Sequence, residues 1–215
     1  MALGLFAVVL DYSNLAPDEF HDWYDLEHNP QRLVVPGFLN ATRWLSLTRP
    51  ATAIALYDLA DIAVMRSTAF AAIGGANGTP WTKRVMARAG RLLRYEGTLL
   101  FSGGDVGSGD AAALRLALTS IDSRNEEEYN NWFSRKHRPA VLKVAGVRAV
   151  RYFIGKDHMQ RRRLLTLYHF DSAGILESND WKENADAESA RWQCATGGDD
   201  LIIDATHYVR RVAAA

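Results

Sequence analysis

The sequence predicts an α+β fold made of two related halves, each with the element order strand, helix, strand, strand, helix, strand. Residue types that are rare in proteins recur in the same order and at a nearly fixed spacing. Within each half, short apolar runs alternate with segments of helical period. A glycine-rich stretch separates the halves, so we place a domain boundary there.

Tryptophan, histidine, proline and glycine show the repeat most clearly. Trp23, His28, Pro30 and Gly37 recur 109 positions later as Trp132, His137, Pro139 and Gly146. Further along, the spacing becomes 111, in the pairs Tyr57 and Tyr168, Ser67 and Ser178, Phe70 and Trp181, and Trp81 and Trp192. Two residues inserted between strands account for the change. We therefore predict repeats at 1–101 and 112–215, joined by a linker at 102–111.

Hydrophobic patterns place the elements. Leu5–Leu10 is continuously apolar, which predicts a strand covered on both faces. In its counterpart, the leucines share one face and Arg115 lies on the other. The first helices are predicted to begin near Pro17 and near Glu126–Glu128, and proline biases the residue before it away from helical geometry, so His28 should lie at a helix end. Further strands are predicted at Phe38–Leu45, Ala53–Leu59, Leu93–Phe101, Leu114–Thr119, Val147–Ile154, Leu164–Phe170 and Leu201–Val209, and helical segments at Val64–Ala72 and Trp81–Leu92.

Composition excludes several classes of protein. Lys+Arg 25 balance Asp+Glu 25, and the isoelectric point is near 7.0, which argues against a nucleic-acid partner. No apolar stretch approaches membrane-spanning length, so no membrane association is predicted. The single cysteine, Cys194, cannot form an intrachain disulfide and is typical of a buried apolar residue, although a nearby base would make it a nucleophile. We expect a cytoplasmic protein.

The sequence from Trp23-Tyr24 through His28-Asn-Pro30 to Pro36-Gly37-Phe38 resembles the EthD-like branch of the dimeric α/β-barrel superfamily. The likeness covers both halves. It implies that each half is a ferredoxin-like βαββαβ unit, and that two antiparallel sheets form a pseudo-dimeric barrel around a cavity. Closure between two chains, giving a homodimer, is left open. One fold hosts many chemistries, so the resemblance does not decide the reaction.

The second half departs from the pattern. It has Lys136 where the first has Glu27, and Phe133 where the first has Tyr24. It also has Arg115 where the first has Phe6. These differences predict a single working site.

Candidate acid–base residues are His28, His137 and Tyr57. Imidazole both accepts and donates a proton near neutral pH. The alternative is that each histidine ends a helix and interacts with its dipole. For His137 the neighbouring cations favour that structural role. The phenol of Tyr57 would donate a hydrogen bond to a substrate oxygen.

Candidate substrate-binding residues are arginines and aromatic residues. Arg115 and Arg151 would hold a substrate carboxylate, or else pair with an acidic side chain. Arg43 and Arg151 are equivalents if the alignment gap follows Gly37. The further candidates are Trp23, Trp132, Tyr168, Trp81 and His207, with core packing as the alternative for the tryptophans. His169 and His207 share no metal-ligand spacing, so neither a metal nor a cofactor is predicted. The glycine clusters at 74–78 and 197–198 are interpreted as turns.

Three functions follow from the resemblance. The first is a cofactor-free lyase or isomerase that transfers a proton on a small aromatic, lactone or polyketide-like acid. The second is a small-molecule-binding or stress-response protein without catalysis. The third is a haem-binding barrel, which requires an axial histidine.

Overall fold

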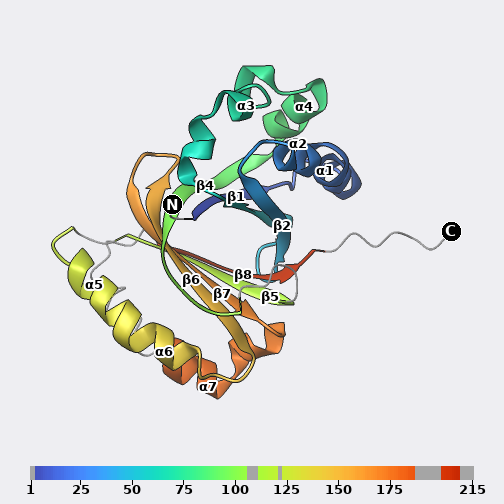
Figure 1. Cartoon of the computed structure of the whole chain (residues 1–215). Coiled ribbons are helices and arrows are strands. Elements are labelled where there is room, and N and C mark those ends of the chain that lie inside the picture. Colours follow the sequence, from blue (N-terminus) through green and yellow to red (C-terminus); the bar gives the residue numbers. More distant parts are fainter. Residues whose placement is uncertain (1–2, 106–110, 121–122, 187–199, 209–215) are drawn as a thin grey trace. The chain divides into compact units, whose positions relative to one another are not determined.

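The computed structural model describes residues 3–105, 111–120, 123–186 and 200–208 (Figure 1). The chain divides into two compact units, Met1–Thr98 with His207–Ala215, and Leu99–Thr206. Part of the predicted linker, 106–110, lies outside the described residues, as do Trp192 and Cys194. No helix in the described part is long and apolar enough to cross a membrane.

The first unit is a four-stranded antiparallel sheet with helices on one face (Figure 1). Its strands are hydrogen-bonded in the order β4-β1-β3-β2. The strands are β1 (Gly4–Asp11), β2 (Phe38–Ser46), β3 (Thr52–Leu59) and β4 (Gly90–Gly104), the last extending into the second unit. The helices are α1 (Pro17–Asp22), α2 (Asn29–Leu33), α3 (Thr68–Ala71) and α4 (Pro80–Arg88), with a π-helical turn at Trp23–His28 and 3₁₀ turns at Ile62–Arg66 and Gly75–Asn77.

The second unit repeats this plan, with strand order β8-β5-β7-β6. The strands are β5 (Ala113–Thr119), β6 (Val147–Asp157), β7 (Arg162–Phe170) and β8 (Leu201–His207). The helices are α5 (Glu126–Trp132), α6 (Arg138–Val141) and α7 (Asn179–Trp181), with π-helical turns at Phe133–His137 and Lys182–Asp186 and a 3₁₀ turn at Ala173–Glu177. Over all eight strands the hydrogen-bonded order closes on itself, β1-β3-β2-β8-β5-β7-β6-β4, so the predicted fold class is confirmed.

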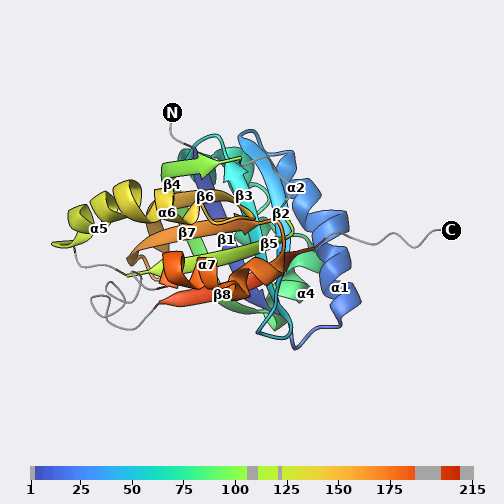
Figure 2. The same ribbon diagram turned by 90° about the horizontal axis from the view of Figure 1, so that it is seen from below.

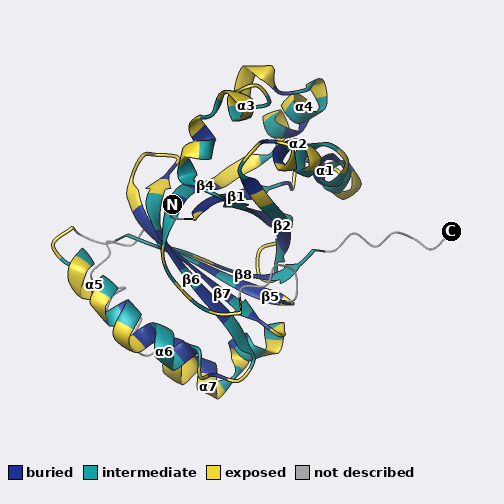
Figure 3. Cartoon of the chain, in the orientation of Figure 1, coloured by how far each residue is buried: buried dark blue, intermediate teal, exposed yellow. Residues whose placement is uncertain are grey.

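The strands β1, β3 and β7 are buried on both faces, while the outer surfaces of the helices are exposed (Figure 3). In β1, Phe6 and Leu10 pack in the layer beneath the helices. Leu5, Ala7 and Val9 point to the opposite face, where each is fully buried. The prediction that β1 is covered on both faces is therefore confirmed.

The predicted starts of the first helices are confirmed, but the predicted end of a helix at His28 is wrong. Pro17 and Glu126 are the first residues of α1 and α5. His28 does not end a helix, because α1, the π-helical turn and α2 follow one another without a break (Figure 2). In the π-helical turn the Asn29 N–H donates to the Tyr24 carbonyl, five residues back. This wider turn lets the chain continue as a helix through Pro30 instead of stopping before it.

The second helical segment of the first repeat ends earlier than predicted. The helix predicted at Trp81–Leu92 ends at Arg88, and β4 begins at Gly90. The predicted pairing of Ser67 with Ser178 has a local reason. Each side chain caps the helix that follows it, accepting the N–H of Phe70 or of Trp181.

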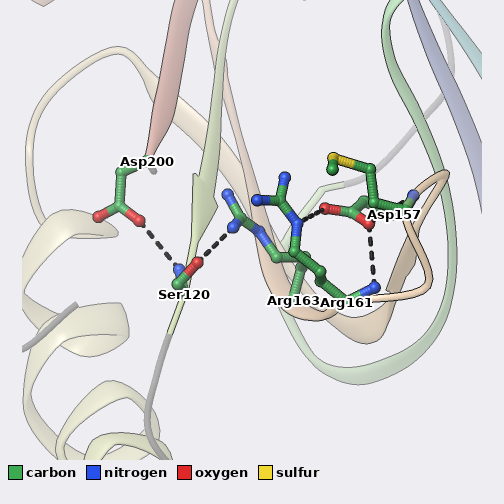
Figure 4. A network of polar contacts seen from close by, with 6 residues as sticks. Ser120, Asp157, Arg161, Arg163 and Asp200 are labelled. Atoms are coloured by element: carbon green, nitrogen blue, oxygen red, sulfur yellow. Dashed lines mark hydrogen bonds and ion pairs between the residues drawn. The ribbon is translucent and has the colours of Figure 1, made fainter. Parts of the chain in front are cut away.

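The two inserted residues lie in the β6–β7 hairpin, since the spacing between the units is 109 up to β6 and 111 from β7 onwards. Asp157 holds this longer hairpin, accepting the N–H groups of Met159 at 2.8 Å and Arg161 at 3.0 Å, and the Arg161 Nε at 2.8 Å (Figure 4). Beyond the hairpin, Arg163 donates to the Ser120 hydroxyl. The Ser120 N–H donates to Asp200 at 2.9 Å.

Gly37 and Gly146 recur because of backbone conformation and space. Their φ angles are +96° and +87°, and an added Cβ would collide with Val64 or Ile175, which are themselves equivalent.

We expect Gly146→Ala to lower the free energy of unfolding by about 2 kcal/mol, through left-handed strain and overpacking. Gly75→Ala is the control. Gly75 also has a positive φ, but an added Cβ there would meet nothing within 4 Å. Urea unfolding measures both, and equal losses would contradict the packing argument.

Candidate active site in the first repeat

His28 lies at the end of the π-helical turn, in the layer between helices and sheet. Its ring is 4.2 Å from that of Trp23 and 5.3 Å from that of Tyr24, between ring centroids. Its Nδ1 is buried without a hydrogen-bond partner. Burial, and secondarily the Arg32 cation, hold the pKa of His28 well below its usual value. The ring is therefore neutral at pH 7, which contradicts a helix-end histidine stabilised as the cation.

Arg32 lies one helical turn beyond His28, and the sequence predictions missed it. It is 7% exposed, and its Nε and Nη1 are buried without partners. Its guanidinium lies 5.2 Å from the centroid of the Phe70 ring. Within the described part of the chain no carboxylate pairs with it. Burial, as the largest cause, lowers the pKa of Arg32 from its usual value.

Tyr57 reaches the same layer from β3. Its hydroxyl donates to the Asn29 side chain at 3.2 Å. Its ring stacks on Phe6 at 5.4 Å and meets Phe38 edge-on at 5.8 Å. Burial raises the pKa of Tyr57 well above its usual value, so the phenol keeps its proton and remains a hydrogen-bond donor.

Glu27 and Trp23 fasten the π-helical turn to α4. The Trp23 indole N–H donates to the Thr82 hydroxyl at 3.0 Å, and that hydroxyl donates to Glu27 at 3.0 Å. The Thr79 hydroxyl donates to the same Glu27 oxygen. Trp23 is fully buried, and its hydrogen bond to Thr82 fixes the orientation of its ring beside His28.

The equivalent place in the second repeat is filled and paired. His137 is buried and hydrogen-bonded to the Tyr168 hydroxyl at 2.7 Å, with Trp132 stacked on its ring at 4.7 Å. The fully buried Trp181 meets Tyr168 edge-on at 5.2 Å. Val141, also fully buried, lies 109 positions after Arg32. An apolar side chain thus replaces the buried cation of the first repeat.

The three predicted arginines all have partners. Arg115 faces away from the leucines of β5, as predicted. That face is the one covered by the helices, and there Arg115 is bidentate with Asp204 at 2.7 and 3.0 Å. Arg43 is buried and paired with Asp25 at 2.8 Å. Arg151 donates to His169 at 3.3 Å. Of the two roles predicted for Arg115, the structure therefore shows the pairing with an acidic side chain.

Arg43 and Arg151 are not equivalents. Arg43 is opposite Ala55 on the helix-covered face, while Arg151 is opposite Leu167 on the other face. The bulges in β2 and β6 fall at matching places, so the spacing of 109 continues and the counterpart of Arg43 is Tyr152. His207 stacks on Trp44, 4.7 Å away, also on a face turned from the helices. The predicted residues are therefore divided between the two faces of the sheets.

Two further places remain. Trp81 is partly buried at the edge of the first core. A surface hollow of about 570 Å³ lies in the second unit, and none of the predicted site residues lines it; its lining is Ser123, Glu126, Glu127, Asn130, Asn131 and Arg162. In the described ranges, no group of three or more histidine, cysteine, aspartate or glutamate side chains is arranged to hold a metal ion.

Solved structures resemble the whole chain. An anthrone oxidase-like protein matches with TM-score 0.71 and 10% identity, over 99% of this chain and 96% of its own. A putative monooxygenase from Fusobacterium nucleatum matches with TM-score 0.63 and 10% identity, over 96% and 93%. A ferredoxin-fold protein related to antibiotic biosynthesis monooxygenases, from Listeria monocytogenes, matches with TM-score 0.57 and 12% identity, over 97% and 95%.

The chain has the fold of the dimeric α/β-barrel proteins. At these identities the likeness concerns the fold alone. The sequence matches no protein-family model and no curated protein. Comparison of the repeats at the spacing of 109 was the sequence signal that could have found Arg32, because it aligns this cation with Val141.

Proposed function

We propose that the chain is a cofactor-independent enzyme of the EthD-like branch, of lyase or isomerase type, with one working site in the first repeat. His28 is the general base. The Tyr57 hydroxyl, which donates to Asn29 in the free protein, turns its proton to the substrate oxygen that gains negative charge. The ligand is a small aromatic, lactone or polyketide-like acid. The observation that carries the proposal is the neutral His28 ring: its Nδ1 is buried without a partner, and in the described residues no tyrosine hydroxyl bonds the ring as that of Tyr168 bonds His137.

The chemistry of His28 limits the substrate. A base whose pKa lies well below the usual value for histidine is weak, so it removes only a proton that is already acidic. Methylene groups activated by a carbonyl or an aromatic ring have such protons. The aromatic side chains Phe6, Phe38, Phe70 and Trp23 around the site suit a flat substrate.

The asymmetry between the repeats supports a single site. His137 already has Tyr168 as its partner, and the larger Trp181 is fully buried at the position that matches Phe70. His28 has no such bond, and Phe70 is partly exposed. We therefore propose His28 rather than His137 as the catalytic histidine.

The test is deuterium exchange at the methylene group of anthrone-2-carboxylate in D₂O under nitrogen, followed by NMR. We expect the wild-type protein to catalyse exchange and His28→Gln to lower the rate at least 100-fold, the usual contribution of a general base. His137→Gln is the matched control and should keep most of the rate. Binding without exchange would favour the non-catalytic alternative, and unchanged exchange in His28→Gln would remove His28 from the mechanism.

A second candidate is oxidation of the same kind of substrate by dioxygen, which begins with the same proton abstraction. The likeness to the anthrone oxidase-like protein favours it. Repeating the assay in air separates the two, because an oxidase consumes oxygen in step with substrate. Haem binding stays a prediction of the resemblance, tested by absorbance after haem is added, and the cytoplasmic location and the homodimer also stay predictions.

A further inference from the structure

Arg32 is a charged group whose surroundings do not explain its burial. A buried guanidinium is normally paired with a carboxylate or fully hydrogen-bonded, because taking an unpaired charge out of water is costly. Two of its three nitrogens, Nε and Nη1, are buried and unpartnered. In the described part of the chain, the groups that favour its charge are the Phe70 ring face and the phenols of Tyr24 and Tyr57. Neutral phenols and a ring face do not balance a full charge.

Other charges nearby make the site more positive. Arg94 is close enough to Arg32 to lower its pKa further, and it lies 5.0 Å from the Phe6 ring. Arg94 pairs with Glu96 at 2.6 Å, and Arg66 pairs with the other oxygen of the same carboxylate. One glutamate is therefore shared by two arginines, while Arg32 has none. Arg94 therefore adds positive charge beside Arg32.

The second repeat shows that the fold does not need this cation. Val141, fully buried in the second core, occupies the matching position. The same helix therefore packs on the same kind of sheet with an aliphatic side chain. A charge kept at such a place, at a cost in stability, indicates a function.

We propose that Arg32 is the anchor for the carboxylate of the ligand, so that the site takes aromatic monocarboxylates and rejects their neutral analogues. A carboxylate spanning Nη2 and one of the unpaired nitrogens matches the planar fork of the guanidinium. Phe70, 5.2 Å from that fork, and Phe38, stacked on Phe70 at 5.8 Å, would contact the ring of the ligand. This inference rests on the proposed function, since it places the acid group of the same substrate one helical turn from His28.

The test uses benzoate as the probe and benzamide as its neutral match, with affinity measured by calorimetry on the full chain. We expect benzoate to bind the wild-type protein at least tenfold more tightly than benzamide. Arg32→Met should remove that preference, and Arg32→Lys should keep part of it, because a lysine retains the charge but not the fork. Equal benzoate affinity in the wild type and in Arg32→Met would overturn the proposal.

Thermal unfolding without ligand gives a second readout. Removing an unpaired buried charge should leave the melting temperature of Arg32→Met unchanged or raised, whereas removing a structural ion pair would lower it. A lowered melting temperature would count against the anchor. Benzoate binding does not depend on turnover. If Arg32→Met loses the preference for benzoate while His28→Gln keeps the exchange rate, the proposed reaction is contradicted and the role of Arg32 as carboxylate anchor is supported.

Discussion

Trp181→Ala is expected to lower the free energy of unfolding by about 4 kcal/mol, the usual cost of deleting a fully buried tryptophan. Trp181 has no exposed surface, and its ring contacts Phe170 at 4.8 Å and Tyr168 at 5.2 Å. It also lies 5.5 Å from the Arg115 guanidinium. Alanine would leave a cavity that these neighbours cannot close, because they are held in place by the strands β5 and β7.

Phe70→Ala is the matched control, because Phe70 holds the equivalent position in the first repeat. Its ring is smaller and partly exposed, so we expect a loss of about half as much. Urea unfolding followed by circular dichroism measures both. If Phe70→Ala cost as much as Trp181→Ala, the second repeat would not be the more completely filled one, and the case for a single site would weaken.

Lowering the pH from 7 to 5 is expected to lower the free energy of unfolding by roughly 2 to 4 kcal/mol through His28 and His169. Burial and the Arg151 cation lower the pKa of His169 to about 3, and the pKa of His28 is well below its usual value. Both rings stay neutral in the folded chain, while the unfolded chain takes up protons below pH 6.5. Their stabilising contribution is therefore complete above pH 6.5 and is lost as the pH falls towards 3.

His169→Asn identifies the source of this pH dependence. Asparagine keeps an acceptor for Arg151 but does not titrate, so roughly half of the loss between pH 7 and pH 5 should disappear. Urea unfolding at the two pH values measures the difference. An unchanged pH dependence in His169→Asn would mean that other groups cause it. Equal stability of the wild type at both values would contradict the burial of neutral histidines.

Much of the fold follows from local signals in the sequence. Pro17 and Glu126 start their helices because proline and acidic residues suit the first turn, wherever the helix packs. Gly37 and Gly146 could be matched because only glycine fits a positive φ with no space for a Cβ. Ser67 and Ser178 could be matched for a local reason as well, since each hydroxyl caps the helix that follows it.

The site was only partly predictable. His28, Tyr57 and Trp23 were selected from their residue types and spacing, and they meet in one layer. Arg43 and Arg151 are not equivalent, because the bulges of β2 and β6 fall at matching places and leave no gap between the repeats. A shift of one residue along a strand moves a side chain to the other face of the sheet. A π-helical turn gives no simple periodic signal, so the helix through Pro30 was missed.

The sequence by itself determined the duplication, the order of the elements and the residue types that differ between the halves. Only the tertiary structure decided which charges are compensated. Arg115 and Asp204 are 89 positions apart, yet they form a bidentate pair, while Arg32 has no carboxylate beside it in the described chain. Charge compensation depends on distances of a few ångströms between distant segments, and spacing along one chain does not contain those distances.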